Sequence, residues 1–247
     1  MAKEGALVTG VGGEIGYGII RCLKHINYNL VLYGCDIDSY APTRDEVKKF
    51  FVIPEASKTQ EYFKVLKNII EKYKIKTVFP TIESEIQFFN EHRDYFESRD
   101  VAVFIHEPAI IDTFFDKYEI IDFLKSHKIP HPQTFLIEEY QGQLGYPVIM
   151  KPRWGSGSKD VIKITNQEEF DFYKKRIPHA VIQEFLPGEG EEYTVGVFFD
   201  GKDVFSIAFR RLIGFGGTSK IVRLVKDKAI EELAERVARS IGVIEHL

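Results

Sequence analysis

The sequence has little of what marks secreted and membrane proteins. It contains two cysteines, Cys22 and Cys35, and no CxxC pair. So few thiols exclude a disulfide framework and a thiolate metal site, and they are typical of proteins in a reducing cytoplasm. No stretch approaches the roughly 18–20 apolar residues of a transmembrane helix, and residues 1–9 lack the apolar core and cleavage site of a signal peptide. We therefore expect a cytoplasmic protein without a membrane partner.

An excess of charge of one sign is also absent. The chain of 247 residues carries 33 Lys and Arg against 37 Asp and Glu, a formal net charge of -4. This balance gives no electrostatic attraction to nucleic acid, so we expect no nucleic-acid partner. Apolar residues make up 44% of the chain. That fraction suits a globular fold with a substantial core, in one large domain or two modest ones.

The first part of the sequence alternates strand-like apolar runs with helical periodicity. Strands are expected at 5–9, 30–35, 50–53, 77–79 and 101–105. Helices are expected after a glycine-rich turn at 10–16, and over 61–73 and 84–96. Repeated strand–helix units indicate an α/β fold with a mainly parallel sheet and helices on both of its faces.

The pattern changes near Pro108. Helices are expected at 109–115 and 116–128, and the second ends at 129–132, because the prolines there lack an amide donor and restrict their predecessors. Strands are then expected at 134–137, 148–151, 161–164, 180–185, 193–200 and 204–210, with helices at 167–176 and 227–241. Asp200-Gly201 is a strong hairpin signal. We predict an α/β domain at 1–112 and an α+β domain at 113–247.

The glycine-rich turn Thr9-Gly10-Val11-Gly12-Gly13-Glu14-Ile15-Gly16 follows the first strand and opens a helix. Glycines permit a tight turn there, and a helix N-terminus attracts phosphate, as in dinucleotide-binding folds. Asp36 follows about 20 residues later, where an acid would bind the ribose. An NAD-dependent oxidoreductase is therefore an open alternative. None of the twelve tyrosines has a lysine four residues later, so the catalytic pair of a short-chain dehydrogenase is absent, and a structural turn or a substrate-side loop competes.

A second glycine-rich segment carries more chemical information. A buried strand delivers Lys151, and the loop Trp154-Gly155-Ser156-Gly157-Ser158-Lys159 follows it. A lysine on a rigid strand can hold a point charge against a phosphate, and glycine and serine offer amides and hydroxyls at close approach. The segment is not a P-loop, because no GxxxxGK[ST] is present. An unpaired ammonium among apolar residues would cost on the order of several kcal/mol, so Lys151 is the residue that is hardest to explain without a ligand. A mobile hairpin loop that binds nothing is the competing interpretation of the segment.

Four features follow one another along the second part of the chain. Asp116-Lys117 opens a helix that ends at 129–132, and the Lys151 strand and its glycine–serine loop come next. The apolar segment 181–188 and the acidic strand start Glu191-Glu192-Tyr193 complete the series. In this combination the chain resembles the ATP-grasp superfamily, in particular its carbamoyl-phosphate-synthetase-like and carboxylate–amine ligase members. The resemblance covers nearly the whole chain, and 1–112 is similar to the Rossmann-like domain that precedes the ATP-grasp domain and usually binds no dinucleotide.

The resemblance implies roles for individual residues. Those that would contact or close over the phosphates are Lys117, Lys151, Arg153, Ser156, Gly157 and Ser158. Those that would read the adenine edge are Glu184, Phe185 and Leu186. The acid that would bind the ribose hydroxyls is Glu192, or Glu191 if the spacing differs. A catalytic arginine, Arg210 or Arg211, would face the transferred phosphate or the substrate.

The resemblance also implies a reaction. ATP would bind between two α+β lobes, and a carboxylate or bicarbonate would attack its γ-phosphate. The acyl phosphate would then pass to an amine or another nucleophile. ATP with Mg²⁺ is the implied cofactor, small-molecule carboxylates and amines are the implied partners, and a homodimer is the default oligomer.

Two departures from the family pattern affect these expectations. Asp160 stands where the family usually has glycine, so closure of the loop is expected to differ. The family's magnesium-binding acid and its Glu-x-Asn motif would lie beyond Leu247, so we assign no metal ligand. Either the chain is an inactive fragment with a partial ATP-grasp domain, or its nucleotide site is incomplete. A nucleotide-binding module without turnover is therefore a third interpretation.

Overall fold

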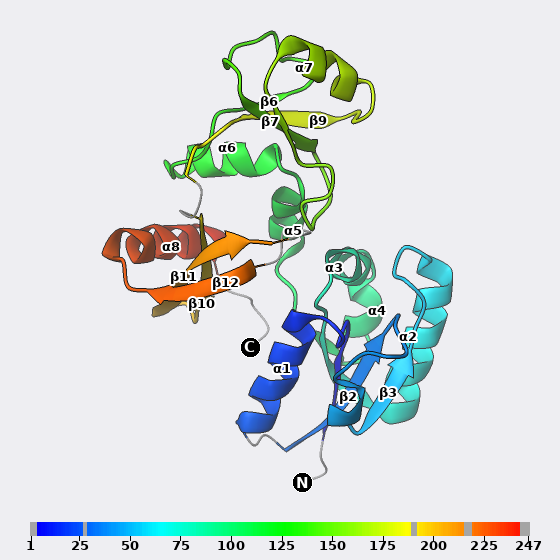
Figure 1. Ribbon diagram of the computed structural model, residues 1–247. Helices are drawn as coiled ribbons and strands as arrows, with labels where there is room; N and C mark the ends of the chain where they lie inside the picture. Colours follow the sequence, from blue (N-terminus) through cyan, green and yellow to red (C-terminus); the bar gives the residue numbers. More distant parts are fainter. Residues whose placement is uncertain (1–3, 27–28, 189–191, 215–218, 243–247) are drawn as a thin grey trace. The chain divides into compact units, whose positions relative to one another are not determined.

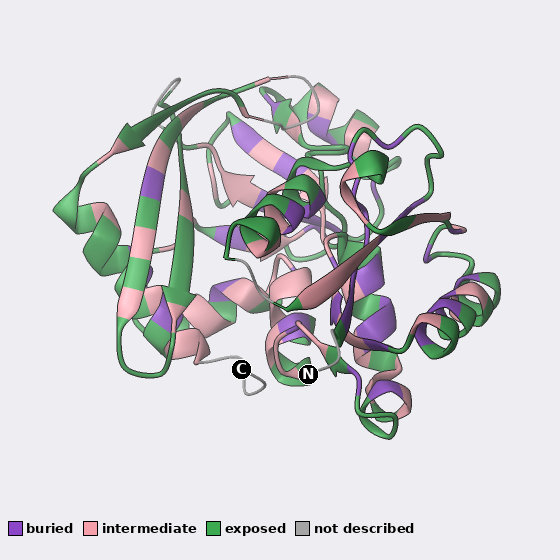
Figure 2. Cartoon of the chain, turned by 90° about the horizontal axis from the view of Figure 1, so that it is seen from below, coloured by how far each residue is buried: buried purple, intermediate pink, exposed green. Residues whose placement is uncertain are grey.

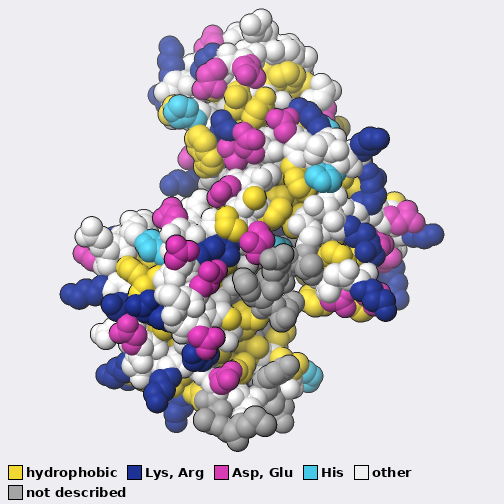
Figure 3. Space-filling view, turned by 180° about the vertical axis from the view of Figure 1, so that it is seen from behind, with side chains coloured by type: hydrophobic (Ala, Val, Ile, Leu, Met, Phe, Trp, Pro, Cys, Tyr) yellow, Lys and Arg dark blue, Asp and Glu magenta, His cyan; other side chains and the backbone are white. Residues whose placement is uncertain are grey.

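The computed structural model describes residues 4–26, 29–188, 192–214 and 219–242 (Figure 1). These residues form two compact units, with the division between Pro108 and Ala109, and each unit is described by itself. Within the described ranges, no helix combines the length and the apolar character that crossing a membrane requires. Basic and acidic side chains are interspersed over the face shown in Figure 3, in keeping with the nearly balanced charge of the sequence.

The first unit is built on a parallel sheet with the strand order β3-β2-β1-β4-β5, which confirms the predicted α/β fold. The strands are β1 (Glu4–Val8), β2 (Leu30–Asp36), β3 (Lys49–Val52), β4 (Ile75–Phe79) and β5 (Ala102–Val103). The helices are α1 (Glu14–His25), the 3-10 helix η1 (Arg44–Glu46), α2 (Thr59–Tyr73), α3 (Glu83–Glu91) and α4 (Arg93–Glu97). The central strand β1 is buried along most of its length, because helices cover both faces of such a sheet.

One predicted helix proves to be two. The prediction of a single helix over 84–96 is wrong, because the chain leaves helical geometry at His92, which has φ −115° and ψ 22°. The ring of His92 stacks on Phe88 with centroids 4.3 Å apart and lies 4.9 Å from the ring of Phe63. Its Nδ1 also lies 2.8 Å from the carbonyl oxygen of Phe88. Aromatic packing of this side chain thus ends α3, and the chain starts a new helix, α4, at Arg93.

The second unit contains a four-stranded antiparallel sheet with the order β6-β9-β7-β8. Its strands are β6 (Thr134–Leu136), β7 (Val148–Pro152), β8 (Ile162–Ile164) and β9 (Ala180–Glu184). Two helices precede the sheet, α5 (Pro108–Phe115) and α6 (Glu119–Ser126), and α7 (Gln167–Lys174) lies between β8 and β9. Val148, Met150 and Ile182 form a core with Phe170 of α7. Alternation along β7 therefore directs Lys151 to the opposite face of the sheet.

A three-stranded antiparallel sheet follows, with the strands β10 (Glu192–Phe199), β11 (Val204–Ile213) and β12 (Ser219–Val225). The helix α8 (Lys228–Ile241) packs on it, and the buried residues there are Ala208, Ala234 and Ala238. The predicted hairpin at Asp200-Gly201 is confirmed, since β10 and β11 pair on either side of it. The strand β12 was not predicted. Its apolar residues do not alternate with polar ones, and most of the sheet is exposed (Figure 2).

Candidate functional site

The lysine on β7 is held by neutral hydrogen-bonding groups. Lys151 Nζ donates to Gln183 Oε1 on β9 at 2.8 Å. Gln183 Nε2 donates to Thr134 Oγ1 at 2.8 Å, and Thr134 donates to the carbonyl oxygen of Pro132 at 3.0 Å. The ammonium is therefore fixed in place without a carboxylate in this series of contacts.

A second lysine, Lys117, contacts the chain where the glycine–serine loop leaves β7. Burial and, secondly, the positive charge of Lys117 lower the pKa of Lys151 below the ordinary lysine value. Lys117 Nζ donates to the carbonyl oxygen of Gly155, and its backbone amide donates to that of Arg153 at 3.0 Å. Like charges held together favour an anion beside them, because the anion relieves their repulsion. The structure thus brings the two lysines assigned to phosphate binding to one place.

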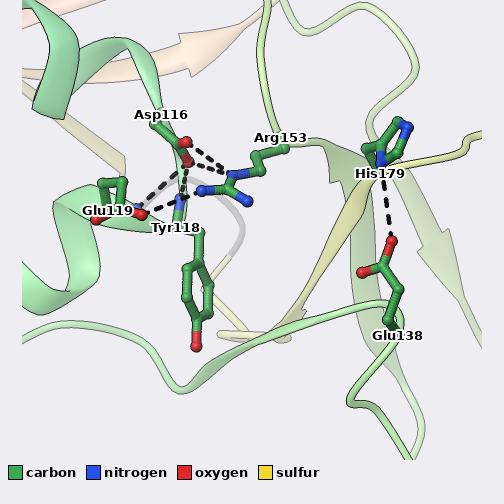
Figure 4. A network of polar contacts seen from close by, with 6 residues as sticks. All are labelled: Asp116, Tyr118, Glu119, Glu138, Arg153 and His179. Atoms are coloured by element: carbon green, nitrogen blue, oxygen red, sulfur yellow. Dashed lines mark hydrogen bonds and ion pairs between the residues drawn. The ribbon is translucent and has the colours of Figure 1, made fainter.

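A network of ion pairs joins the start of α6 to the end of β7 (Figure 4). Arg153 Nε donates to Asp116 Oδ1 and Oδ2 at 2.8 and 2.7 Å. A terminal nitrogen of the same guanidinium donates to Glu119 Oε1 at 3.1 Å. Asp116 Oδ1 also accepts from the backbone amides of Tyr118 and Glu119, at 2.9 and 3.3 Å. The carboxylate of Asp116 thus connects the helix start to the strand end.

The ionised forms of this pair stabilise each other. Burial raises the pKa of Asp116, but the hydrogen bond from Arg153 and the two backbone amides outweigh it, so the pKa lies below the ordinary aspartate value. The hydrogen bond to Asp116 in turn raises the pKa of Arg153. The backbone amide of Arg153 donates to the carbonyl oxygen of His179 at 3.0 Å, which ties the strand end to β9. Both side chains are therefore charged and fixed at neutral pH.

The glycine–serine loop has an unusual backbone. Gly155, Gly157, Ser158 and Asp160 have positive φ angles of 110°, 68°, 56° and 57°. Open space surrounds the position of a Cβ atom at both glycines, so they are required for conformation rather than for close packing. Asp160 adopts the left-handed region that aspartate tolerates better than most residues, in the position where glycine was expected. Ser156 and Ser158 are exposed.

The segment assigned to the adenine edge lies at the end of β9. Glu184 pairs with Val148 of β7, and its carboxylate accepts from the backbone amide of Gln133 at 2.9 Å. Lys163 Nζ lies 4.0 Å from the ring centroid of Phe185. Leu186 is exposed. The segment 184–186 therefore directly follows Gln183, the partner of the β7 lysine.

The three-stranded sheet separates the two candidate arginines. Glu192 pairs with Arg211 across β10 and β11, and Arg210 pairs with Tyr193. Since side chains alternate along a strand, Arg211 shares a face with Glu192 and Arg210 lies on the other face. Arg211 Nε lies 3.9 Å from Glu192 Oε2 and, among the described residues, has no hydrogen-bond partner although it is buried. The competing acid, at position 191, lies outside the described residues.

The first glycine-rich turn is occupied by its own aspartate. Asp36 Oδ2 accepts from the amide of Gly12 at 2.7 Å, and Oδ1 accepts from that of Asp38 at 2.9 Å. A Cβ atom at Gly16 would lie 2.5 Å from the carbonyl oxygen of Gly10, so the last glycine of the turn is required for close packing. The acid expected at a cofactor ribose thus holds the loop backbone instead. This geometry favours the structural interpretation of the turn over NAD binding.

Three polar residues of the site were not predicted to take part. The sequence marks Asp116 only as the start of a helix, and it marks Gln183 and Thr134 only as strand residues. Their partners lie 32 to 49 positions away in the sequence, where periodicity gives no signal. Among the described residues, no group of three or more His, Cys, Asp or Glu is arranged to hold a metal ion. We therefore assign no metal ligand.

The sequence matches two family models. The ATP-grasp domain matches residues 114–245, and the PylC-like N-terminal domain matches residues 7–104. A curated relative, the arginine-specific large chain of carbamoyl phosphate synthase from Halalkalibacterium halodurans, is 22% identical over 226 residues. The alignment covers 83% of this chain and 20% of the relative.

Solved structures show the same fold. The L-amino acid ligase from Bacillus licheniformis matches with a TM-score of 0.74 and 11% identity, over 98% of this chain and 61% of that one. N5-carboxyaminoimidazole synthetase from Staphylococcus aureus, complexed with ADP, matches with a TM-score of 0.72 and 16% identity, over 96% and 63%. This chain thus spans less than two thirds of either structure. Because the ATP-grasp model matches more than half of its residues, the chain belongs to the ATP-grasp family.

Proposed function

We propose that the chain binds ATP and uses it to activate a carboxylate as an acyl phosphate, which an amine or another nucleophile then attacks. The observation that carries this proposal is the contact of Lys117 with Arg153 and Gly155, at the start of the glycine–serine loop that follows Lys151. Two ammonium groups beside a glycine-rich backbone suit a polyphosphate, whose charge they would neutralise. Membership of the ATP-grasp family supports the same class of reaction.

In this proposal, different segments hold different parts of the nucleotide. The two lysines bind the phosphates, and Ser156, Gly157 and Ser158 close over them. The segment 184–186 holds the adenine, with the ring of Phe185 as an apolar surface. Glu192 binds the ribose hydroxyls. Arg211, on the same face as Glu192, is favoured over Arg210 as the arginine that faces the transferred phosphate or the substrate.

The proposed reaction depends on how the substrates are placed and on the positive charges that surround the phosphates. A carboxylate oxygen attacks the γ-phosphorus in line, the bond from phosphorus to the bridging oxygen breaks, and ADP leaves. The nucleophile then adds to the acyl carbon, and phosphate leaves with the electron pair of the carbon–oxygen bond. The lysines stabilise the negative charge on the phosphate oxygens. A closed loop keeps out water that would hydrolyse the acyl phosphate.

Calorimetric titration of the full chain with MgATP tests binding, and ADP release with a panel of carboxylates and amines tests turnover. We expect Lys151→Met to weaken binding about tenfold or more, since a hydrogen bond to a charged group contributes roughly 1.5–3 kcal/mol. The matched control is Lys175→Met, at an exposed lysine after α7, which should bind normally. Binding of NAD⁺ in place of MgATP would contradict the proposal. Tight MgATP binding without ADP release would favour a nucleotide-binding module instead.

A further inference from the structure

Arg153 lies two residues after Lys151, yet its guanidinium points toward two carboxylates (Figure 4). An arginine that binds phosphate directly presents its fork of N–H donors to the phosphate oxygens. Here, Nε donates to Asp116 and a terminal nitrogen donates to Glu119. The guanidinium of Arg153 is thus already bound to two carboxylates, and it is not a free ligand for phosphate.

We infer that Asp116 and Arg153 are positioning residues, which hold the two phosphate lysines at one anion site without touching the phosphates. This inference rests on the proposed function of that site. It assigns to Arg153 a task other than the contact with phosphate that the family resemblance implies for its loop.

The contacts around Lys117 support this inference. Lys117 directly follows Asp116. The carboxylate of Asp116 accepts hydrogen bonds from the backbone amides of Tyr118 and Glu119, the two residues after Lys117. The amide of Lys117 itself donates to the carbonyl oxygen of Arg153 at 3.0 Å. The backbone around Lys117 is therefore held by the two residues of one ion pair, through the carboxylate of Asp116 and the backbone carbonyl of Arg153. Its ammonium group consequently reaches the loop that begins beside Lys151.

The Asp116–Arg153 pair is shielded from solvent, unlike the ion pair within α6. The side chains of Asp116 and Arg153 are 9% and 22% exposed, whereas those of Asp122 and Lys125 on α6 are 58% and 51% exposed. Exposed pairs contribute little, but removing one partner of a shielded pair leaves an uncompensated charge. The Arg153 guanidinium also lies 5.0 Å from the Trp154 ring, which further restricts its position.

The first test measures amine labelling of the two lysines in the ligand-free full chain, by peptide mass spectrometry. The variants are Asp116→Asn and Arg153→Gln, and the matched control is Asp122→Asn, at the exposed ion pair within α6. In both variants, Lys117 should label severalfold faster, because it leaves the carbonyl oxygen of Gly155. Lys151 should label more slowly at a fixed pH, because loss of the nearby charge raises its pKa. General loosening would instead speed both reactions, and that result, or unchanged rates, would overturn the inference.

The second test measures MgATP affinity in a double-mutant cycle. Each single variant should bind MgATP about tenfold more weakly. The two losses should not add, which is typical of residues in one network. The double variant should lose no more than either single one, because both changes break the same pair. If Arg153 instead contacts phosphate, Arg153→Gln will weaken binding further in the Asp116→Asn background, which contradicts a positioning role.

The conservative variant Arg153→Lys keeps the inference testable if Asp116→Asn does not fold. Should Asp116→Asn fail to give a cooperative unfolding transition, Arg153→Lys keeps the positive charge but can serve only one carboxylate at a time. In Arg153→Lys, Lys117 should again label faster and Lys151 more slowly, by smaller factors than in the other variants. Unchanged labelling of both lysines would overturn the inference. If the wild-type chain fails to bind MgATP, the proposed function falls, while the labelling test still decides whether the pair positions the lysines.

Discussion

Lys151 and Gln183 are diagonal neighbours on the adjacent strands β7 and β9, with the ammonium donating to the amide oxygen at 2.8 Å. The amide nitrogen of Gln183 donates to Thr134, whose hydroxyl donates onward to a backbone carbonyl. A neutral acceptor orients the lysine but leaves its full positive charge for a ligand. A carboxylate in the same position would orient it equally well and would also neutralise it.

Substitution of Gln183 should separate orientation from charge. Gln183→Met leaves the lysine without an acceptor, so the free energy of unfolding should fall by about 1–3 kcal/mol, and MgATP affinity should fall with it. Gln183→Glu should preserve stability, because it forms an ion pair with Lys151, yet still weaken MgATP binding through repulsion of the phosphates. Urea unfolding and calorimetry measure the two quantities. Gln143→Met, at an exposed loop glutamine, is the control, and equal behaviour of all three variants would refute this account.

The pKa of Lys151 predicts how nucleotide binding depends on pH. Burial and the charge of Lys117 lower this pKa, so the ammonium loses its proton below the ordinary lysine value of about 10.4. MgATP affinity should therefore be high at neutral pH and fall as the pH rises through the lowered pKa. Titration calorimetry at several alkaline pH values measures this decline. Lys151→Met should flatten it, and an unchanged pH profile in that variant would assign the decline to another group.

Two glycines of α1 should respond in opposite ways to the same substitution. Gly16→Ala places a Cβ atom 2.5 Å from the carbonyl oxygen of Gly10, so it should destabilise the fold by about 1–3 kcal/mol or more. Gly18→Ala meets nothing within 4 Å, and should stabilise the helix by about 0.5–1 kcal/mol. Thermal and urea unfolding measure both effects. Destabilisation by both substitutions would mean that helix packing at Gly18 is tighter than described.

A buried carboxyl group in the first unit should make stability depend on pH. Glu85 is 4% exposed and accepts from Thr9 at 2.6 Å and Tyr62 at 2.9 Å. Burial raises its pKa, although these hydrogen bonds partly offset the rise. A raised pKa in the folded state means that the contribution of Glu85 to stability is fully present below its unfolded pKa of about 4.3 and is lost as the pH rises through the folded value.

Glu85→Gln tests this dependence, because the amide stays neutral at every pH. The stability of the variant relative to the wild type should increase as the pH rises from 4 toward 7, as measured by urea unfolding at several pH values. The exposed Glu83 on the same helix offers the control Glu83→Gln, whose difference from the wild type should stay nearly constant. A constant difference for Glu85→Gln as well would show that the pKa of Glu85 is the same in the folded and unfolded states.

Local patterns predicted most of the fold. Apolar runs and helical periodicity gave the parallel sheet of the first unit, and the motif order around Lys151 indicated the family. The break at His92 could not be predicted in this way, because it depends on how the ring packs against Phe63 and Phe88. The strand β12 was missed for a related reason. Its side chains are exposed on both faces, so no alternation marks it.

The candidate site was predictable in residue type but not in pairing. Alternation alone says that Arg210 and Arg211 point to opposite faces, but the register of β10 and β11 is needed to place Arg211 beside Glu192. Likewise, Arg153 could be assigned to a loop from its position after β7. Its ion pair with Asp116 joins residues 37 positions apart, and no local pattern reports such a contact.

Trp154 gives this chain a built-in optical probe. It is the single tryptophan of the sequence, it opens the glycine–serine loop, and it is 51% exposed, with its ring 6.2 Å from that of His179. Indole emission therefore arises from this loop alone and depends on how much water surrounds the ring. Stopped-flow fluorescence of the unlabelled protein can consequently time the movement of the loop, separately from any chemical step.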